Sequence, residues 1–323
     1  MKNNFDMSLK LGANSVHKKR QFSQQKNENY RKKYLKNGLI KKNFLIKTNC
    51  PVCKKHNKET LFNKGGGNYK KCNYCTMIYL DPVFKNNALN NYYKNNHDAQ
   101  SQISINEKYF YNKMFGSGLN LIKSSKKKID NLLDIGCSNG LFLDLVKKKQ
   151  IKTYGIELNN NEYKISSKKH SVECKSIFSY KVKKKFDCIT MWDVIEHIKD
   201  TNKLFNKINL LLNKGGLFFF QTPNAYSLAS IILQEKCNVF DGIEHTNLFS
   251  LKSINFIAKK HSFKIKKIST VISEIPIINN YLNYENPYLG KNKEKKILNT
   301  INEKEIHKNL LGYKFQVILE KQK

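Results

Sequence analysis

Short apolar runs alternate with amphipathic segments from residue 131 to the end of the chain, and this alternation limits the fold more than any other feature. Four apolar runs have the length and composition of buried strands: residues 131–136, 153–157, 186–192 and 216–223. Strands that are separated by helical segments usually lie parallel, because the chain must cross back over the sheet between them. The pattern therefore predicts an α/β domain with a doubly wound, mostly parallel sheet.

The remaining segments of this region complete the expected plan. In residues 201–216 the apolar side chains fall on one helical face, and we expect Gly215 and Gly216 to end that helix. Ser250 is a suitable N-cap for a second helix, and residues 263–272 and 313–321 read as closing strands. Residues 225–248 and 275–310 interrupt the pattern. Insertions after strand ends are where α/β proteins build substrate pockets.

Four of the eight cysteines form two close pairs in the N-terminal part of the chain. The segments "CPVC" and "CNYC" contain Cys50, Cys53, Cys72 and Cys75. Each CxxC turn presents two thiolates, and two such turns complete a tetrahedral zinc site. A redox CxxC motif would need a surrounding βαβ unit, which is not found here. We therefore expect residues 46–84 to form a small zinc ribbon with a glycine-turn hairpin, folded around a structural zinc ion.

The other N-terminal residues are polar and strongly basic. Residues 1–45 have few large apolar side chains and are expected to be a disordered basic tail, and residues 85–125 a connector with a helix near 107–122. The formal charge is +34, but arginine occurs only at positions 20 and 31. Phosphate-gripping surfaces usually use arginine, so we favour a lysine-rich composition over a nucleic-acid footprint. No segment approaches the roughly 18 to 20 apolar residues of a membrane span, and the cysteine usage suggests a cytoplasmic protein.

The stretch "NLLDIGCSNG" places a glycine-rich turn directly after the first predicted strand. The dinucleotide fingerprint would need glycine at Ser138 and Leu141, so the pattern here is instead D-x-G-x-S-x-G. Asp134 would repel a pyrophosphate and would suit a cation. The second strand ends at Glu157, an acid placed to hold a ribose diol. A nucleoside with a positive charge and no phosphate is expected, and S-adenosylmethionine (SAM) meets that description.

Residues 130–270 resemble the class I SAM-dependent methyltransferases, in particular the group that contains the ubiquinone-biosynthesis O-methyltransferases and many small-molecule and sugar methyltransferases. The segments that carry the resemblance are "LLDIGCSNG", "GIELN", "FDCITMWDVIEHI", "LLNKGGLFFFQTPN" and "EHTNLFSLKSINFIAKKHSF". The Cys segment is similar to the zinc ribbon of bacterial methyltransferases from surface-glycan or secondary-metabolite pathways. The resemblance implies a seven-stranded, Rossmann-like sheet and a methyltransferase domain over residues 126–323.

The resemblance also implies a set of cofactor-binding residues. The set is Asp134, Gly136, Ser138, Gly140, Glu157, Leu158, Ser176, Ile177, Met191 and Trp192. Asp134 and the two glycines would line the methionine and ribose, Glu157 would bind the ribose hydroxyls, and Leu158 would pack by the adenine. Met191 and Trp192 would lie beneath the sulfonium. Many members carry an acid after the third strand to hold the adenine amino group, whereas this sequence has Ser176 and Ile177 there.

Candidate catalytic residues follow the fourth strand. If the turn after Trp192 is helical, Asp193, Glu196 and His197 share one face, and His245 could approach from a later loop. One hypothesis makes His197 or His245, with Asp193, the general base for a hydroxyl acceptor. A second uses all four side chains to bind Mg²⁺, as the similar E-x-x-E-H…H arrangement of small-RNA 2′-O-methyltransferases implies. A third gives these residues only a bracing role.

The sequence therefore predicts a SAM-dependent methyltransferase that acts on a small-molecule acceptor, with a hydroxyl of a sugar or another metabolite as the expected target. Two alternatives come from other classes. The chain could be a metal-dependent RNA 2′-O-methyltransferase that grips the strand with lysine side chains. It could also be a non-catalytic scaffold that retains the SAM fold.

Overall fold

The computed structural model describes residues 32–89, 108–181, 184–283 and 301–322. Its main sheet has seven strands in the order β10-β9-β8-β11-β12-β15-β14. The strands are β8 (Asn131–Ile135), β9 (Lys152–Glu157), β10 (Ser171–Cys174), β11 (Phe186–Trp192), β12 (Leu212–Pro223), β14 (Phe263–Val271) and β15 (Lys314–Lys321). The first five are parallel, and β15 is antiparallel to both of its neighbours. The predicted doubly wound, seven-stranded and mostly parallel sheet is confirmed.

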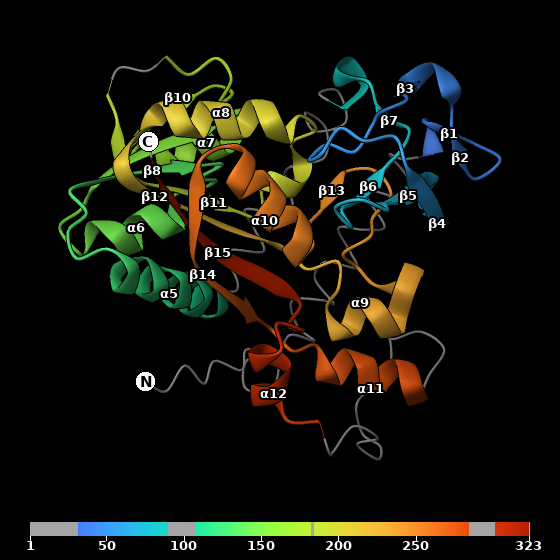
Figure 1. Cartoon of the computed structure of the whole chain (residues 1–323). Helices are drawn as coiled ribbons and strands as arrows, with labels where there is room; N and C mark the ends of the chain where they lie inside the picture. Colours follow the sequence, from blue (N-terminus) through green and yellow to red (C-terminus); the bar gives the residue numbers. More distant parts are fainter. Residues whose placement is uncertain (1–31, 90–107, 182–183, 284–300, 323) are drawn as a thin grey trace.

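Helices cover both faces of this sheet (Figure 1). Helices α5 (Lys108–Ser125) and α6 (Leu141–Lys147) pack on one face, in a core that includes Phe142 and Phe219. Helices α8 (Thr201–Leu211) and α10 (Leu251–Lys260) pack on the other, around Phe205 and Phe218. Helix α7 (Asn160–Ser166) joins β9 to β10. Because successive side chains of a strand point to opposite faces, the buried run of β12 supplies both cores at once.

The start of α10 agrees with the sequence prediction, whereas the end of α8 differs from it. The Ser250 side chain caps α10, as the sequence predicts, and Ser253 completes a reciprocal capping pair with it. Helix α8, however, ends at Leu211 and not at the two glycines. Leu212 already pairs with Phe186 as part of β12, and the ladder then shifts register before Leu217 pairs with Cys188. The glycines therefore lie in a bulge of the strand, where they do not end the helix.

The cysteine module is a second, smaller sheet. Strands β4 (Lys58–Lys64), β5 (Gly67–Cys72) and β6 (Ile78–Leu80) form an antiparallel meander with the expected glycine turn. A fourth strand, β13 (Asn247–Leu248), pairs with β6 and comes from the insertion at 225–248. Figure 1 shows β13 at the edge of this small sheet, next to β6. The insertions also contain α9 (Leu228–Leu233), η3 (Gln234–Lys236), α11 (Ile275–Asn283) and α12 (Glu303–Lys308).

Part of the predicted N-terminal tail has local structure. Residues 1–31 and most of the 85–107 connector lie outside the described residues, but 35–46 form β1 (Leu35–Lys36), β2 (Leu39–Ile40), η1 (Lys42–Phe44) and β3 (Leu45–Ile46). Strand β3 pairs with β7 (Val83–Phe84). Tyr34 and Ile40 are buried with Phe84, which gives this segment a small core of its own. No helix in the described ranges has both the length and the apolar character required to cross a membrane.

Candidate active site

The turn after β8 folds back tightly on β9. The Gly136 N–H donates to the Ile156 carbonyl at 2.8 Å, and Gly140 has φ of +86°. A Cβ at Gly140 would lie 2.9 Å from Cδ2 of His170, so this position requires glycine for both its backbone angle and its surroundings. The predicted glycine turn is therefore a close-packed element that holds Ser138 over the end of β9.

Glu157 lies at that end, and three backbone N–H groups fix its carboxylate. Oε1 accepts from Leu158 at 2.7 Å and from Asn159 at 2.8 Å, and Oε2 accepts from Ser138 at 2.8 Å. Burial raises the pKa of Glu157, and the three hydrogen bonds oppose that rise. A carboxylate offers about four acceptor positions, so Oε2 keeps capacity for a ribose hydroxyl.

Glu162 is a second acid at the same turn, and the sequence pattern did not predict it. Its Oε2 accepts from the Ser138 hydroxyl at 2.8 Å, and the residue is only 5% exposed. Its position in the first turn of α7 was the only available signal, and acids are common there for reasons of helix stability alone.

Asp134 is buried at the end of β8. The Thr190 hydroxyl donates to its Oδ1 at 2.6 Å. Burial, with a smaller contribution from Glu157, raises the pKa of Asp134 to about 8 despite that hydrogen bond. A cation beside this side chain would restore its ionised form, since an opposite charge nearby favours the carboxylate.

The other predicted cofactor residues differ in their surroundings. Leu158 is 70% exposed next to Glu157, and Ile177 is buried. The Ser176 hydroxyl accepts from the Phe178 N–H. Met191 is part of the core, and the Trp192 indole packs against Phe115, Phe142 and Phe219. The indole is thus part of the core.

Glu196, His197 and His245 meet beyond the end of β11. The first two lie in the short helix η2 (Ile195–His197), and one side-chain ligand atom of each of the three lies within 4.8 Å of the others. The His197 Nδ1–H donates to the Glu244 carbonyl at 3.0 Å, and the His245 Nδ1–H donates to the Val239 carbonyl at 2.7 Å. These bonds place the basic Nε2 of each neutral ring on the side away from the carbonyl.

Glu196 is fully buried within this cluster. Its Oε2 accepts from the Thr222 hydroxyl at 3.1 Å, whereas its Oε1 has no hydrogen-bond partner among the described residues. Burial and the nearby Asp193 raise the pKa of Glu196 to about 7. Burial alone would lower the pKa of His245, but the carboxylates of Asp241 and Glu196 outweigh it and the net shift is upward. The cluster can therefore accept a proton near neutral pH.

Asp193 does not join the cluster, although we expected it on the same face. Its backbone has φ of +53°, and its carboxylate accepts from Lys314 Nζ and from Gln221 Nε2. The left-handed backbone turns the side chain toward β12 and β15. The Asp193 carboxylate is therefore paired with Lys314 and does not lie with Glu196, His197 and His245. The four side chains do not come together as the predicted metal site.

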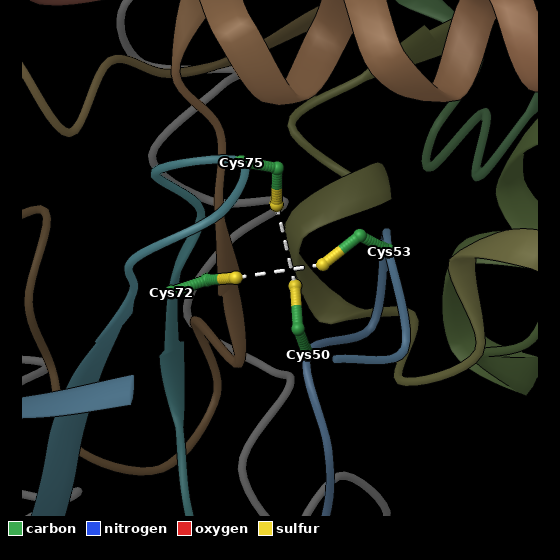
Figure 2. Close-up of side chains that lie close together, drawn as sticks. All are labelled: Cys50, Cys53, Cys72 and Cys75. Atoms are coloured by element: carbon green, nitrogen blue, oxygen red, sulfur yellow. Dashed lines mark hydrogen bonds between the residues drawn. The ribbon is translucent and has the colours of Figure 1, made fainter. Parts of the chain in front are cut away.

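The four paired cysteines converge as predicted (Figure 2). The Sγ atoms of Cys50 and Cys75 are 3.4 Å apart, as are those of Cys53 and Cys72, and all four lie within 4.8 Å of one another. Zinc–sulfur bonds of about 2.3 Å in a tetrahedron would give sulfur separations of about 3.8 Å, so the cluster fits a zinc ion closely. No oxygen or nitrogen ligand is needed to complete it.

A surface cavity of about 440 Å³ lies between α5 and α6. It is lined by Lys108, Asn112, Leu141, Asp144, Leu145, Lys147 and Lys148. None of the predicted cofactor or catalytic residues lines this cavity. We therefore place the candidate site at the turn after β8 and at the histidine cluster, and not at the cavity.

Comparisons with known proteins agree with this geometry. The profile of a family described as "Methyltransferase domain" matches residues 69–268. A ubiquinone biosynthesis O-methyltransferase from Pelagibacter ubique is 33% identical over 113 residues, which cover 32% of this chain and 47% of the relative. One from Colwellia psychrerythraea is 24% identical over 149 residues, covering 41% and 60%.

A crystal structure of a SAM-dependent methyltransferase from Clostridium acetobutylicum is 15% identical, with a TM-score of 0.45, over 65% of this chain and 92% of that one. The matched segment spans about half the length of the Pelagibacter ubique relative.

Proposed function

The chain belongs to the class I SAM-dependent methyltransferases, and from that premise we propose that it transfers a methyl group from SAM to an oxygen of a small-molecule acceptor. The relatives that it resembles are O-methyltransferases of ubiquinone biosynthesis, which supports oxygen as the acceptor atom. A sugar or other metabolite hydroxyl remains the acceptor class that we expect. Residence in the cytoplasm remains an expectation from the cysteine pattern.

We assign the two halves of the site to the two reactants. Asp134, the turn after β8 and Glu157 bind SAM, and the cluster of Glu196, His197 and His245 faces the acceptor. Both lie at the carboxyl edge of the parallel strands, where α/β proteins bind their ligands. The observation that carries the proposal is the cluster directly beyond β11, in which the buried Glu196 meets two partly exposed histidines and can accept a proton.

In the reaction, the acceptor oxygen forms a bond to the methyl carbon as the bond between carbon and sulfur breaks. His245 Nε2 takes the hydroxyl proton, and the ionised Glu196 stabilises the resulting imidazolium. S-adenosylhomocysteine leaves with the electron pair of the broken bond on its sulfur. The carbonyl of Val239 holds the ring of His245 in the required tautomer.

The magnesium hypothesis finds no support in this arrangement. With Asp193 bound to Lys314, the cluster offers two imidazoles and one carboxylate. Magnesium prefers oxygen ligands in octahedral geometry, so this donor set does not suit it. This also weakens the RNA 2′-O-methyltransferase alternative, which depended on the four-residue metal site.

We also propose that Cys50, Cys53, Cys72 and Cys75 hold one structural zinc ion. The short sulfur separations support this, as does the small size of the module, which metal binding would stabilise.

The experiment measures SAM binding by calorimetry, then transfer of labelled methyl from SAM to a catechol, a free hexose and a short RNA. We expect transfer to a small hydroxyl compound. His245→Asn should lower kcat by about 10²- to 10⁴-fold, the usual contribution of a general base, with unchanged SAM affinity. His261→Asn is the matched control, because His261 bonds to Asn202 and Asn206 outside the site.

Equal turnover by His245→Asn and the wild type would contradict the role of His245. Transfer to RNA alone would contradict the small-molecule acceptor. Transfer that requires added magnesium in zinc-loaded protein would restore the metal hypothesis.

A further inference from the structure

His245 lies in a loop that hydrogen-bonds to the cysteine module on one side and to η2 and the residue after it on the other. On the module side, β13 pairs with β6 through Asn247 and Leu248, and the Leu80 N–H donates to the Thr246 carbonyl at 3.0 Å. The two residues that follow His245 are therefore part of the module's ladder. A displacement of the module would carry this loop with it.

Tyr69, on β5 of the module, hydrogen-bonds to His245 itself. Its hydroxyl donates to the His245 carbonyl at 3.2 Å and accepts from the N–H groups of Asp241 and Gly242, each at 3.1 Å. The residue is fully buried. One hydroxyl thus fixes both ends of the tight turn from 241 to 245.

The two main chains also touch at glycines. A Cβ on Gly242 would lie 1.9 Å from the Lys64 carbonyl oxygen, and a Cβ on Gly67 would lie 2.1 Å from the Gly242 carbonyl oxygen. Backbone packed this closely cannot slide without losing the contact. The hairpin of β4 and β5 is therefore a rigid support for the turn.

The opposite side of the loop holds the other half of the cluster. The Thr246 hydroxyl donates to the Glu196 carbonyl at 3.0 Å, and the Asn247 amide donates to the Ile198 carbonyl at 2.5 Å. The rings of His197 and His245 have centroids 5.1 Å apart. The loop thus joins the module to η2, with His245 at the junction.

We propose that the cysteine module is a structural part of the catalytic site, in which Tyr69 is the positioning residue that holds His245 against Glu196 and His197. The inference rests on the proposed function, because it assigns the base of that reaction to a loop that the module holds.

The test compares Tyr69→Phe with Tyr74→Phe. Tyr74 belongs to the same module, but it is 50% exposed and its ring packs on Phe256, away from the loop. Zinc content, melting temperature, SAM affinity and kcat are measured for both. Histidine-labelled protein reports the ring contact between His197 and His245 as a nuclear Overhauser effect.

We expect Tyr69→Phe to keep its zinc and to bind SAM within twofold of the wild type. Its kcat should fall by about 10- to 100-fold, since a shift of about 1 Å at a reacting group has that effect. The contact signal between the two rings should weaken. Tyr74→Phe should match the wild type in every measurement.

Thr246→Val tests the same loop from the η2 side, and it should also weaken the ring contact while SAM affinity is kept. An unchanged ring contact and an unchanged kcat in Tyr69→Phe would overturn the proposal. The ring contact needs no acceptor. A wild-type protein that transfers no methyl group would therefore contradict the proposed function alone, and the positioning role would still be decided.

Discussion

Replacing Glu157 by glutamine tests the cofactor assignment with a change of a single atom type. In the wild type, Oε1 accepts two backbone N–H groups and Oε2 accepts the Ser138 N–H. In Glu157→Gln, if the remaining oxygen keeps the two bonds of Oε1, the new amide N–H₂ faces the Ser138 N–H and a ribose hydroxyl loses its charged acceptor. A hydrogen bond to a charged group contributes about 1.5–3 kcal/mol. We expect the Kd for SAM to rise by about 10- to 150-fold.

The assay is calorimetric titration with SAM at constant pH, with melting temperatures measured on the same samples. The free energy of unfolding should change little, because two effects oppose each other. The substitution leaves the buried Ser138 N–H without an acceptor, which destabilises the fold, but it also removes a buried charge, which stabilises it. Glu173→Gln is the matched control. Glu173 lies on the neighbouring strand β10, pairs with Lys175 and is partly exposed, so its loss should leave Kd within twofold. A folded Glu157→Gln protein with wild-type affinity would refute the assignment of Glu157 to the ribose.

Three further predictions concern pH, metal and backbone. Because the pKa of Asp134 is raised to about 8, SAM binding must release its proton below that pH. Affinity should therefore rise by up to about tenfold per unit from pH 6 to 8, less steeply for S-adenosylhomocysteine, which has no sulfonium charge. A slope in Asp134→Asn equal to the wild type would contradict this. Cys72→Ser should lower bound zinc well below one ion per chain by elemental analysis and reduce the melting temperature, since metal binding stabilises such modules; full zinc occupancy would argue against the four-cysteine site. Gly140→Ala should lower the free energy of unfolding by about 1–3 kcal/mol because of its φ of +86° and the contact with His170. Gly116→Ala, in open space on α5, should instead raise it by about 0.4–1 kcal/mol in the same denaturant titration. Equal effects of the two substitutions would contradict the strain argument.

Local sequence patterns predicted the sheet, the Ser250 cap, the cysteine cluster and the turn that holds Glu157. Each depends on residues that are near in sequence, or on strand ends that a parallel sheet must bring to one edge. The pattern did not predict the bulge at Gly215 and Gly216, because a glycine after a helical segment is compatible with either a helix end or a bend in the next strand. Whether it ends a helix or bends a strand depends on the partner strand, here β11.

The surroundings of Glu196, His197 and His245 depend on contacts between residues that are distant in sequence. Asp193 meets Lys314 across 121 positions, and Tyr69 meets His245 across 176. No spacing rule indicates such pairs, because they form only when the sheet and the module are both folded. The positive φ of Asp193, which turns its side chain toward Lys314, is likewise a property of the folded chain that no sequence spacing indicated.

The sequence alone therefore predicted the fold class, the glycine turn after β8 and the cluster of four cysteines, since apolar periodicity, glycine positions and cysteine spacing are properties of the chain itself. The tertiary structure decided which side chains form the cluster beyond β11. It removed Asp193 from the cluster by pairing it with Lys314, and it brought β13 into the cysteine module so that His245 meets Glu196 and His197. The physical reason is that hydrogen bonds and ion pairs of buried groups must be satisfied in the folded state, and only the folded chain determines which partners are within reach.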